Sequence, residues 1–223
     1  MSTDALVTLE RDGGLWIATL NRPDKANALT EPMLSDLADI AEAAQEARVF
    51  VLTGAGKVFS AGADLDAARA GLATSPVWER LSRAIAALPG LSIAALNGTV
   101  AGGATGMALA CDIRIAAEGA GAFYPVMKLG FLPQPSDPAR LAALIGPARA
   151  KMILLAGARL STQEALDWGL FDRVVPGDSL MQSARDLAAN ALVASPDHAA
   201  ANCGSYYDWI SLSGVGQLTS KDF

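Results

Sequence analysis

Two glycine-rich segments of this sequence offer the backbone positions best suited to chemistry. The first runs from Gly54 to Leu65 and the second from Asn97 to Gly106, and each follows a short apolar run. Because glycine lets a ligand oxygen approach the backbone, two such loops can direct two N–H groups at one carbonyl oxygen. That arrangement is an oxyanion hole, which stabilises enolates and tetrahedral intermediates. The alternative is that these glycines only turn the chain, since glycine clusters alone are weak signals.

Outside these loops we consider three further side chains for a role in chemistry. Tyr124 is able to donate a proton or a hydrogen bond, or it packs as an aromatic with a satisfied hydroxyl. Asp137 is able to act as an acid or base, although its place before Pro138 favours a helix N-cap. The single histidine, His198, lies in a polar, helix-initiating segment, which favours a surface or cap role. The sequence contains no cluster of His, Cys and carboxylate residues that would predict a metal site.

The elements that must position these residues follow an α/β pattern. Apolar runs predict strands at residues 6–10, 15–20, 49–53, 92–96 and 113–116. Apolar residues at helical spacing predict helices at residues 31–44, 76–88, 102–110, 139–144, 148–155, 161–168 and 179–194, the first with Thr30 as its cap. Strands that alternate with helices favour a largely parallel sheet, in which ligands lie beyond the carboxyl ends of the strands.

Composition limits the classes of partner. Of the 223 residues, 52% are hydrophobic and the net charge is -6, which favours a large core and makes a nucleic-acid partner unexpected. The two cysteines form no disulfide framework, and Cys111 lies in an apolar run typical of a buried thiol. We also find no signal-peptide pattern and no apolar run long enough for a membrane span. We therefore expect a cytoplasmic protein.

Several sequence blocks occur in the order and spacing of one known family. They lie at residues 21–29, 52–54, 59–65, 93–98, 101–103, 110–113, 157–165 and 168–176. With these blocks the chain resembles the enoyl-CoA hydratase/isomerase (crotonase) superfamily. The resemblance implies an α/β fold, a crotonase-type spiral of ββα units with a helical C-terminal appendage. It implies a core at residues 1–160 that carries the CoA-binding loops. The appendage at 161–223 would serve oligomerisation, as a trimer or hexamer.

The resemblance also implies roles for particular residues. The backbone N–H groups of Ala63 and Gly103 would form the oxyanion hole for an acyl-CoA thioester, with coenzyme A as part of the substrate and no separate cofactor. The residues implied to line the CoA path are Arg22, Lys25, Ala26, Ala28, Ala61, Asp64 and Leu65. Arg22 and Lys25 would attract the phosphates, or else they are solvated loop charges. We expect Asp64 to order its loop or cap the following residues.

The sequence departs from the family at both glutamates that hydratases use. The first glutamate position is Gly106, and the second falls on Val126 with one gap beside Tyr124, or on Met127 without the gap. None of these side chains titrates, so ordinary hydration is expected to be very weak. Some relatives carry a catalytic aspartate near residues 132–137. We expect a lyase or isomerase of fatty acid metabolism that stabilises the enolate of its thioester substrate. The alternative is a non-catalytic acyl-CoA-binding protein.

Overall fold

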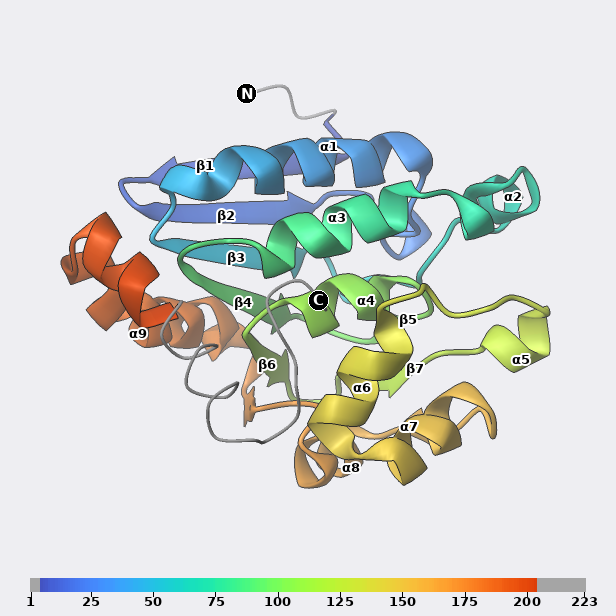
Figure 1. Cartoon of the computed structure of the whole chain (residues 1–223). Coiled ribbons are helices and arrows are strands. Elements are labelled where there is room, and N and C mark those ends of the chain that lie inside the picture. Colours follow the sequence, from blue (N-terminus) through green and yellow to red (C-terminus); the bar gives the residue numbers. More distant parts are fainter. Residues whose placement is uncertain (1–4, 204–223) are drawn as a thin grey trace.

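The computed structural model describes residues 5–203, so the sequence beyond residue 203, which shows no clear periodicity, lies outside the description (Figure 1). Within this range six strands form the main sheet in the order β1-β2-β3-β4-β6-β9. They are β1 (Val7–Asp12), β2 (Leu15–Leu20), β3 (Val49–Gly54), β4 (Leu91–Leu96), β6 (Ile113–Ala117) and β9 (Arg173–Val175). A smaller sheet in the same range has the order β5-β7-β8, with β5 (Val100–Ala101), β7 (Ala122–Phe123) and β8 (Arg159–Leu160).

Helices follow most of these strands, as the apolar spacing predicts. They are α1 (Glu31–Ala43), α2 (Leu65–Arg69), α3 (Val77–Ala86), α4 (Ala104–Ala110), α5 (Val126–Leu129), α6 (Asp137–Ile145), α7 (Pro147–Leu154), α8 (Thr162–Trp168) and α9 (Leu180–Val193). Strands β1 and β2 pair antiparallel, and the described pairs from β2 to β9 are parallel. The expected α/β core with a largely parallel sheet is therefore confirmed. Among the described residues, none of the helices combines the length and apolar character that crossing a bilayer requires.

The central strands β3, β4 and β6 are buried on both faces, and successive side chains of a strand point to opposite faces. In β3, Phe50 and Leu52 pack into the core that contains residues of α1, α3 and α4. Val49 and Val51 instead pack with residues of α9. In Figure 1 this helix lies apart from α1 and α3. Strand β9 pairs with β6 in the main sheet, so parts of the chain beyond residue 160 contact the core directly. A role of residues 161–223 in oligomerisation stays a prediction.

The expected cap of α1 is wrong. Thr30 has the extended backbone of an N-cap, but its hydroxyl makes no capping hydrogen bond. The hydroxyl is buried without a hydrogen-bond partner in the described part of the chain. A capping side chain accepts from the second or third helical N–H group, and here the second residue is Pro32, which has none. The proline therefore removes one of the two backbone N–H groups that are available to a capping side chain.

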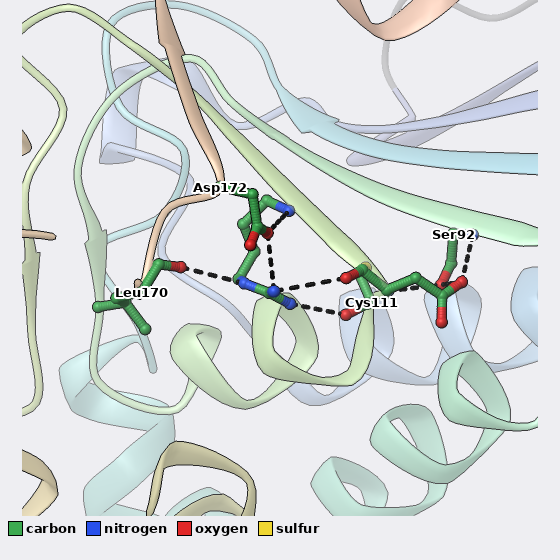
Figure 2. Close-up of polar contacts among 6 residues, drawn as sticks. Ser92, Cys111, Leu170 and Asp172 are labelled. Carbon is green, nitrogen blue, oxygen red and sulfur yellow. Dashed lines mark hydrogen bonds and ion pairs between the residues drawn. The ribbon is translucent and has the colours of Figure 1, made fainter. Parts of the chain in front are cut away.

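A buried arginine joins three parts of the core. Arg114 of β6 donates through Nε to the carbonyl of Leu170 at 3.0 Å and through Nη1 to that of Cys111 at 2.8 Å (Figure 2). Its Nη2 lies 2.7 Å from Asp172 Oδ2, which also accepts the backbone N–H group of Arg114. The guanidinium thus connects the end of α4, strand β6 and the segment that leads to β9.

Candidate active site

A partly open pocket with a cavity volume of about 100 Å³ lies beyond the carboxyl ends of β3 and β4, where the sequence predicts ligand binding. Ala61 and Ala63 come from the first glycine-rich loop, and Gly102 and Gly103 come from the second. Apolar side chains form most of the remaining wall: Leu65, Ala68, Ala73, Trp78, Pro125, Val126, Leu129, Phe131 and Leu132. Such a lining suits an acyl chain better than a charged ligand.

The two glycine-rich loops run in parallel register. Ser60 pairs with Val100: the N–H group of Ala101 donates to the Ser60 carbonyl at 3.0 Å. Two residues further along each loop, Gly62 and Gly102 have left-handed φ values of 89° and 55°. A Cβ atom at Gly62 would lie 2.7 Å from the carbonyl oxygen of Ala101, so the loops pack this closely only because glycine is present.

The register brings the two predicted donors, Ala63 and Gly103, to the same pocket, each one residue after its glycine. The N–H group of Leu29 donates to the Gly62 carbonyl, and that of Asp64 donates to the Leu29 carbonyl, both at 2.8 Å. In a parallel pair the residue between these two bonds directs its own N–H group to the other side. The Ala63 N–H group therefore points away from Leu29.

Trp78 of α3 packs directly against Gly103. A Cβ atom at Gly103 would lie 2.9 Å from Cζ3 of the indole ring. The indole N–H group donates to the carbonyl of Leu72 at 2.8 Å, which fixes the ring in place. Trp78 was not predicted from the sequence as a pocket residue, although its place in the predicted helix at 76–88 made it a candidate for burial.

A buried amide supports the first loop. Asn27 has no exposed surface, and its Nδ2 donates to the carbonyls of Ala55 and Val58 at 2.9 and 2.8 Å. Ser60 Oγ donates to the Asn27 carbonyl at 2.8 Å and accepts the N–H group of Gly62 at 3.1 Å. Both residues lie inside the family-like blocks, which was the available signal, but neither was singled out from the sequence.

Asp64 orders its loop, as expected. Its Oδ1 accepts the N–H groups of Asp66 and Ala67 at the start of α2, at 3.1 and 3.3 Å. Its Oδ2 accepts from Arg22 Nη1 at 2.8 Å, and this hydrogen bond lowers the pKa of the Asp64 carboxyl. Arg22 also donates to the carbonyl of Ala28 at 2.9 Å. The proposed attraction of phosphates by Arg22 and by the exposed Lys25 stays a prediction.

The two residues that the sequence offered for the second glutamate position, Val126 and Met127, differ in their location. Val126 is buried and lines the pocket, whereas 62% of Met127 is exposed. The first position, Gly106, lies in α4 and faces Asp137 of α6. A Cβ atom at position 106 would overlap Asp137 Oδ1 and lie 2.8 Å from Oδ2. The carboxyl group of Asp137 thus occupies the space in which a side chain at position 106 would begin.

Tyr124 connects this carboxyl group to the pocket. The ring lines the pocket, and its hydroxyl donates to Asp137 Oδ2 at 2.8 Å and accepts the N–H group of Gln134 at 3.3 Å. The preference for Asp137 as an N-cap is therefore wrong. Asp137 is the first residue of α6, and its side chain turns toward Tyr124, with Oδ1 unpaired within residues 5–203. The hydrogen bond to the Tyr124 hydroxyl, which is distant in sequence, takes the place of a capping bond to the N–H groups of α6.

The surroundings of the pair favour the protonated, uncharged form of its carboxyl group. Burial raises the pKa of Asp137 to about 7, although the Tyr124 hydroxyl and Arg140 oppose this shift, while Glu79 adds to it. Burial, followed by the charge of Asp137, also raises the pKa of Tyr124 well above its usual range. Glu79 itself is buried and accepts the backbone N–H group of Ser136 at 3.0 Å. That contact anchors the segment in front of α6 to α3.

Asp137→Asn is expected to stabilise the protein at alkaline pH. The folded wild type binds the carboxyl proton more tightly than the unfolded chain, whose pKa is the usual 3.8. Wild-type stability therefore falls as the pH rises from about 4 to about 7, and the neutral amide avoids this loss. We expect an advantage of roughly 4 kcal/mol for the variant at pH 8 that disappears near pH 4.

Urea unfolding at several pH values measures this effect. The control is Thr105→Val, which alters another buried polar side chain near Gly106 without changing any titration. The difference between Thr105→Val and the wild type is expected to be independent of pH. An advantage of Asp137→Asn that did not grow with pH would contradict a raised carboxyl pKa.

Comparison with known proteins gives one consistent result. Residues 10–219 match the family model described as enoyl-CoA hydratase/isomerase. The chain is 38% identical over 203 residues to a carnitinyl-CoA dehydratase of Salmonella enteritidis, covering 84% of this chain and 75% of that protein. It is 32% identical over 219 residues to an enoyl-CoA isomerase/hydratase of Mycosarcoma maydis, covering 88% of this chain and 80% of the relative.

A solved structure agrees with the sequence matches. The crystal structure of an enoyl-CoA hydratase from Mycobacterium avium subsp. paratuberculosis superimposes with a TM-score of 0.84. The two are 32% identical, and the match covers 98% of this chain and 89% of the other. The crotonase-type fold expected from the sequence blocks is confirmed. The chain belongs to the enoyl-CoA hydratase/isomerase family.

Proposed function

We propose that this protein is an enzyme that binds an acyl-CoA thioester and stabilises its enolate through the backbone N–H groups of Ala63 and Gly103. The observation that carries the proposal is the parallel register of the two glycine-rich loops, with both residues on one pocket. Backbone N–H groups held rigidly in a site with little water stabilise negative charge on a thioester oxygen, because they need no reorganisation during the reaction.

The reaction supported best is a shift of a double bond next to the thioester. Hydration requires groups that hold and split water, and Gly106 and Val126 supply none. A double-bond shift requires only that one group remove a proton and return it to another carbon. The enolate between the two steps carries its charge on the thioester oxygen. The relatives named above include an isomerase/hydratase and a dehydratase, both of which act on CoA thioesters by name.

In this proposal coenzyme A enters as part of the substrate, without a separate cofactor. The residues proposed along its path are Arg22, Lys25, Ala26, Ala28, Ala61, Asp64 and Leu65. The apolar wall of the pocket would receive the acyl chain. We further propose a cytoplasmic homo-oligomer, a trimer or hexamer as is common in the family.

A panel of acyl-CoA thioesters tests the proposal. The purified protein is incubated with crotonyl-CoA, 3-enoyl-CoAs and β-ketoacyl-CoAs, and products are separated by chromatography with mass detection. Conversion of a 3-enoyl-CoA to its 2-enoyl isomer is the expected result. Binding without any conversion would favour the alternative, a non-catalytic acyl-CoA-binding protein, which the loss of both glutamates supports. Fast hydration of crotonyl-CoA would contradict the reading of Gly106 and Val126.

A further inference from the structure

We infer that Tyr124 and Asp137 act together as the proton carrier of this pocket, in the place of the glutamate that Gly106 does not supply. The inference rests on the proposed function, because it assigns the proton transfer that the enolate chemistry requires. It also explains why α4 carries a glycine at position 106: the carboxyl group of Asp137 from α6 takes the place of a side chain there.

The first support is the position of the carboxyl group. Asp137 reaches from α6 into the space above Gly106 of α4, where a larger side chain would overlap its Oδ1. An acid lost from one helix is therefore matched by an acid that enters the same volume from another helix. A protein that had merely lost its catalytic groups would not be expected to keep a buried carboxyl group there, since burial of an unneeded carboxyl is costly.

The second support is the path from the carboxyl group to the pocket. Asp137 has no exposed surface and does not line the pocket, so it cannot touch a substrate directly. Tyr124 lines the pocket and is hydrogen-bonded to Asp137 Oδ2 at 2.8 Å. A phenolic hydroxyl both donates and accepts, so it passes a proton on without storing charge.

The proton steps balance within the site. In the first step the Tyr124 oxygen takes a proton from the carbon next to the thioester carbonyl, while its own hydroxyl proton moves to Asp137. The breaking C–H bond leaves its electron pair in the enolate, whose oxygen faces Ala63 and Gly103. In the second step the carboxyl proton returns to the Tyr124 oxygen, which protonates the distal carbon. No oxidant, reductant or further reactant is consumed.

The electrostatics fit a concerted transfer. Burial raises the pKa of Tyr124 so far that a free phenolate would not accumulate, hence both protons must move together. The pKa of about 7 lets Asp137 accept and return a proton near neutral pH. The charged groups that bear on Asp137 are Arg140 on its own helix and Glu79 on α3. Helix α4 contributes Thr105 and Gly106, which do not ionise.

The experiment compares Tyr124→Phe, Asp137→Asn and Thr105→Val with the wild type, using a 3-enoyl-CoA. Tyr124→Phe and Asp137→Asn are each expected to lower kcat by about 100-fold or more. The dissociation constant of a saturated acyl-CoA should stay within about threefold, since neither change removes binding contacts to coenzyme A. Thr105→Val serves as the matched buried control and should keep full activity. Wild-type kcat should rise with pH through about 7 and then level off.

Isotope transfer adds a readout that a structural role would not change. In these steps the proton taken from the substrate stays on the Tyr124 oxygen, and because only 3% of Tyr124 is exposed, this proton is delivered to the distal carbon before it exchanges with solvent. A 3-enoyl-CoA deuterated at the carbon next to the carbonyl is therefore expected to carry most of its deuterium to the distal carbon in ordinary water.

The outcomes separate this inference from the proposed function. Normal acyl-CoA binding with both variants within about threefold of wild-type kcat would overturn the Tyr124–Asp137 carrier while leaving the proposed function intact. Complete loss of the deuterium to solvent would overturn it as well, because water would then be the acid. Absence of acyl-CoA binding by the wild type would instead refute the proposed function, and the inference with it.

Discussion

Replacing Gly103 by proline is expected to lower the turnover of the acyl-CoA substrate by about 100- to 1000-fold. Proline removes the N–H group that we propose as one of two donors to the thioester oxygen. The backbone at this position has φ -59°, which proline adopts without strain, so the loop path should survive. The loss should appear in kcat, because the missing interaction strengthens as negative charge develops on the oxygen.

Gly103→Ala is the matched control for this experiment. Alanine keeps the N–H group but adds a Cβ atom, which would lie 2.9 Å from the Trp78 ring. Both variants therefore press on Trp78, and only the proline variant loses the donor. We expect the alanine variant to be clearly more active than the proline variant. Equal activities would show that crowding of Trp78, and not loss of the N–H group, accounts for the effect.

Arg114→Met is expected to lower the free energy of unfolding by about 3 kcal/mol. The methionine fills part of the volume but leaves the buried carbonyls of Leu170 and Cys111 without the donors that Arg114 supplies. Asp172 loses its ion pair as well, although 38% of that side chain is exposed and remains hydrated. Urea unfolding followed by circular dichroism measures the change.

An arginine-to-methionine substitution at the exposed Arg80 is the matched control for Arg114→Met. Arg80 contacts Asp39 and Glu42, but 42% of the Arg80 side chain is exposed, so water and salt screen these pairs. Arg80→Met should leave the unfolding midpoint close to that of the wild type. If the two variants unfolded at similar midpoints, burial of the Arg114 network would not be the source of its contribution.

The sequence was sufficient for elements whose signal is local and repeated. Strand β3 is a continuous apolar run, as expected for a strand covered on both faces, and it was predicted within one residue. The loops after β3 and β4 were identified by their glycines, and the left-handed φ of Gly62 and Gly102 shows why these residues are required. Sequence alone indicated this half of the candidate site because the chemistry we propose for it uses backbone N–H groups.

Tyr124 and Asp137 were named from the sequence as acid or base candidates, but the contact between them was not predicted. Sequence spacing made Asp137 a helix cap, and the local rule failed because Tyr124, 13 residues earlier, offers a buried hydroxyl that only the folded chain brings near. The overlap between Asp137 and position 106 joins two helices that no periodicity connects. Likewise, the sequence showed that Pro32 removes one donor for a cap at Thr30, but only the structure shows that the Thr30 hydroxyl makes no capping hydrogen bond at all.

The shared volume of Gly106 and Asp137 restricts the order in which mutations can accumulate at this site. A side chain added at position 106 while Asp137 is present would collide with the carboxyl group, and Asp137 shortened while Gly106 is present would leave a void. The packing cost of a change at one position therefore depends on the residue at the other. A side chain at position 106 should be accommodated more easily when residue 137 is shortened in the same variant.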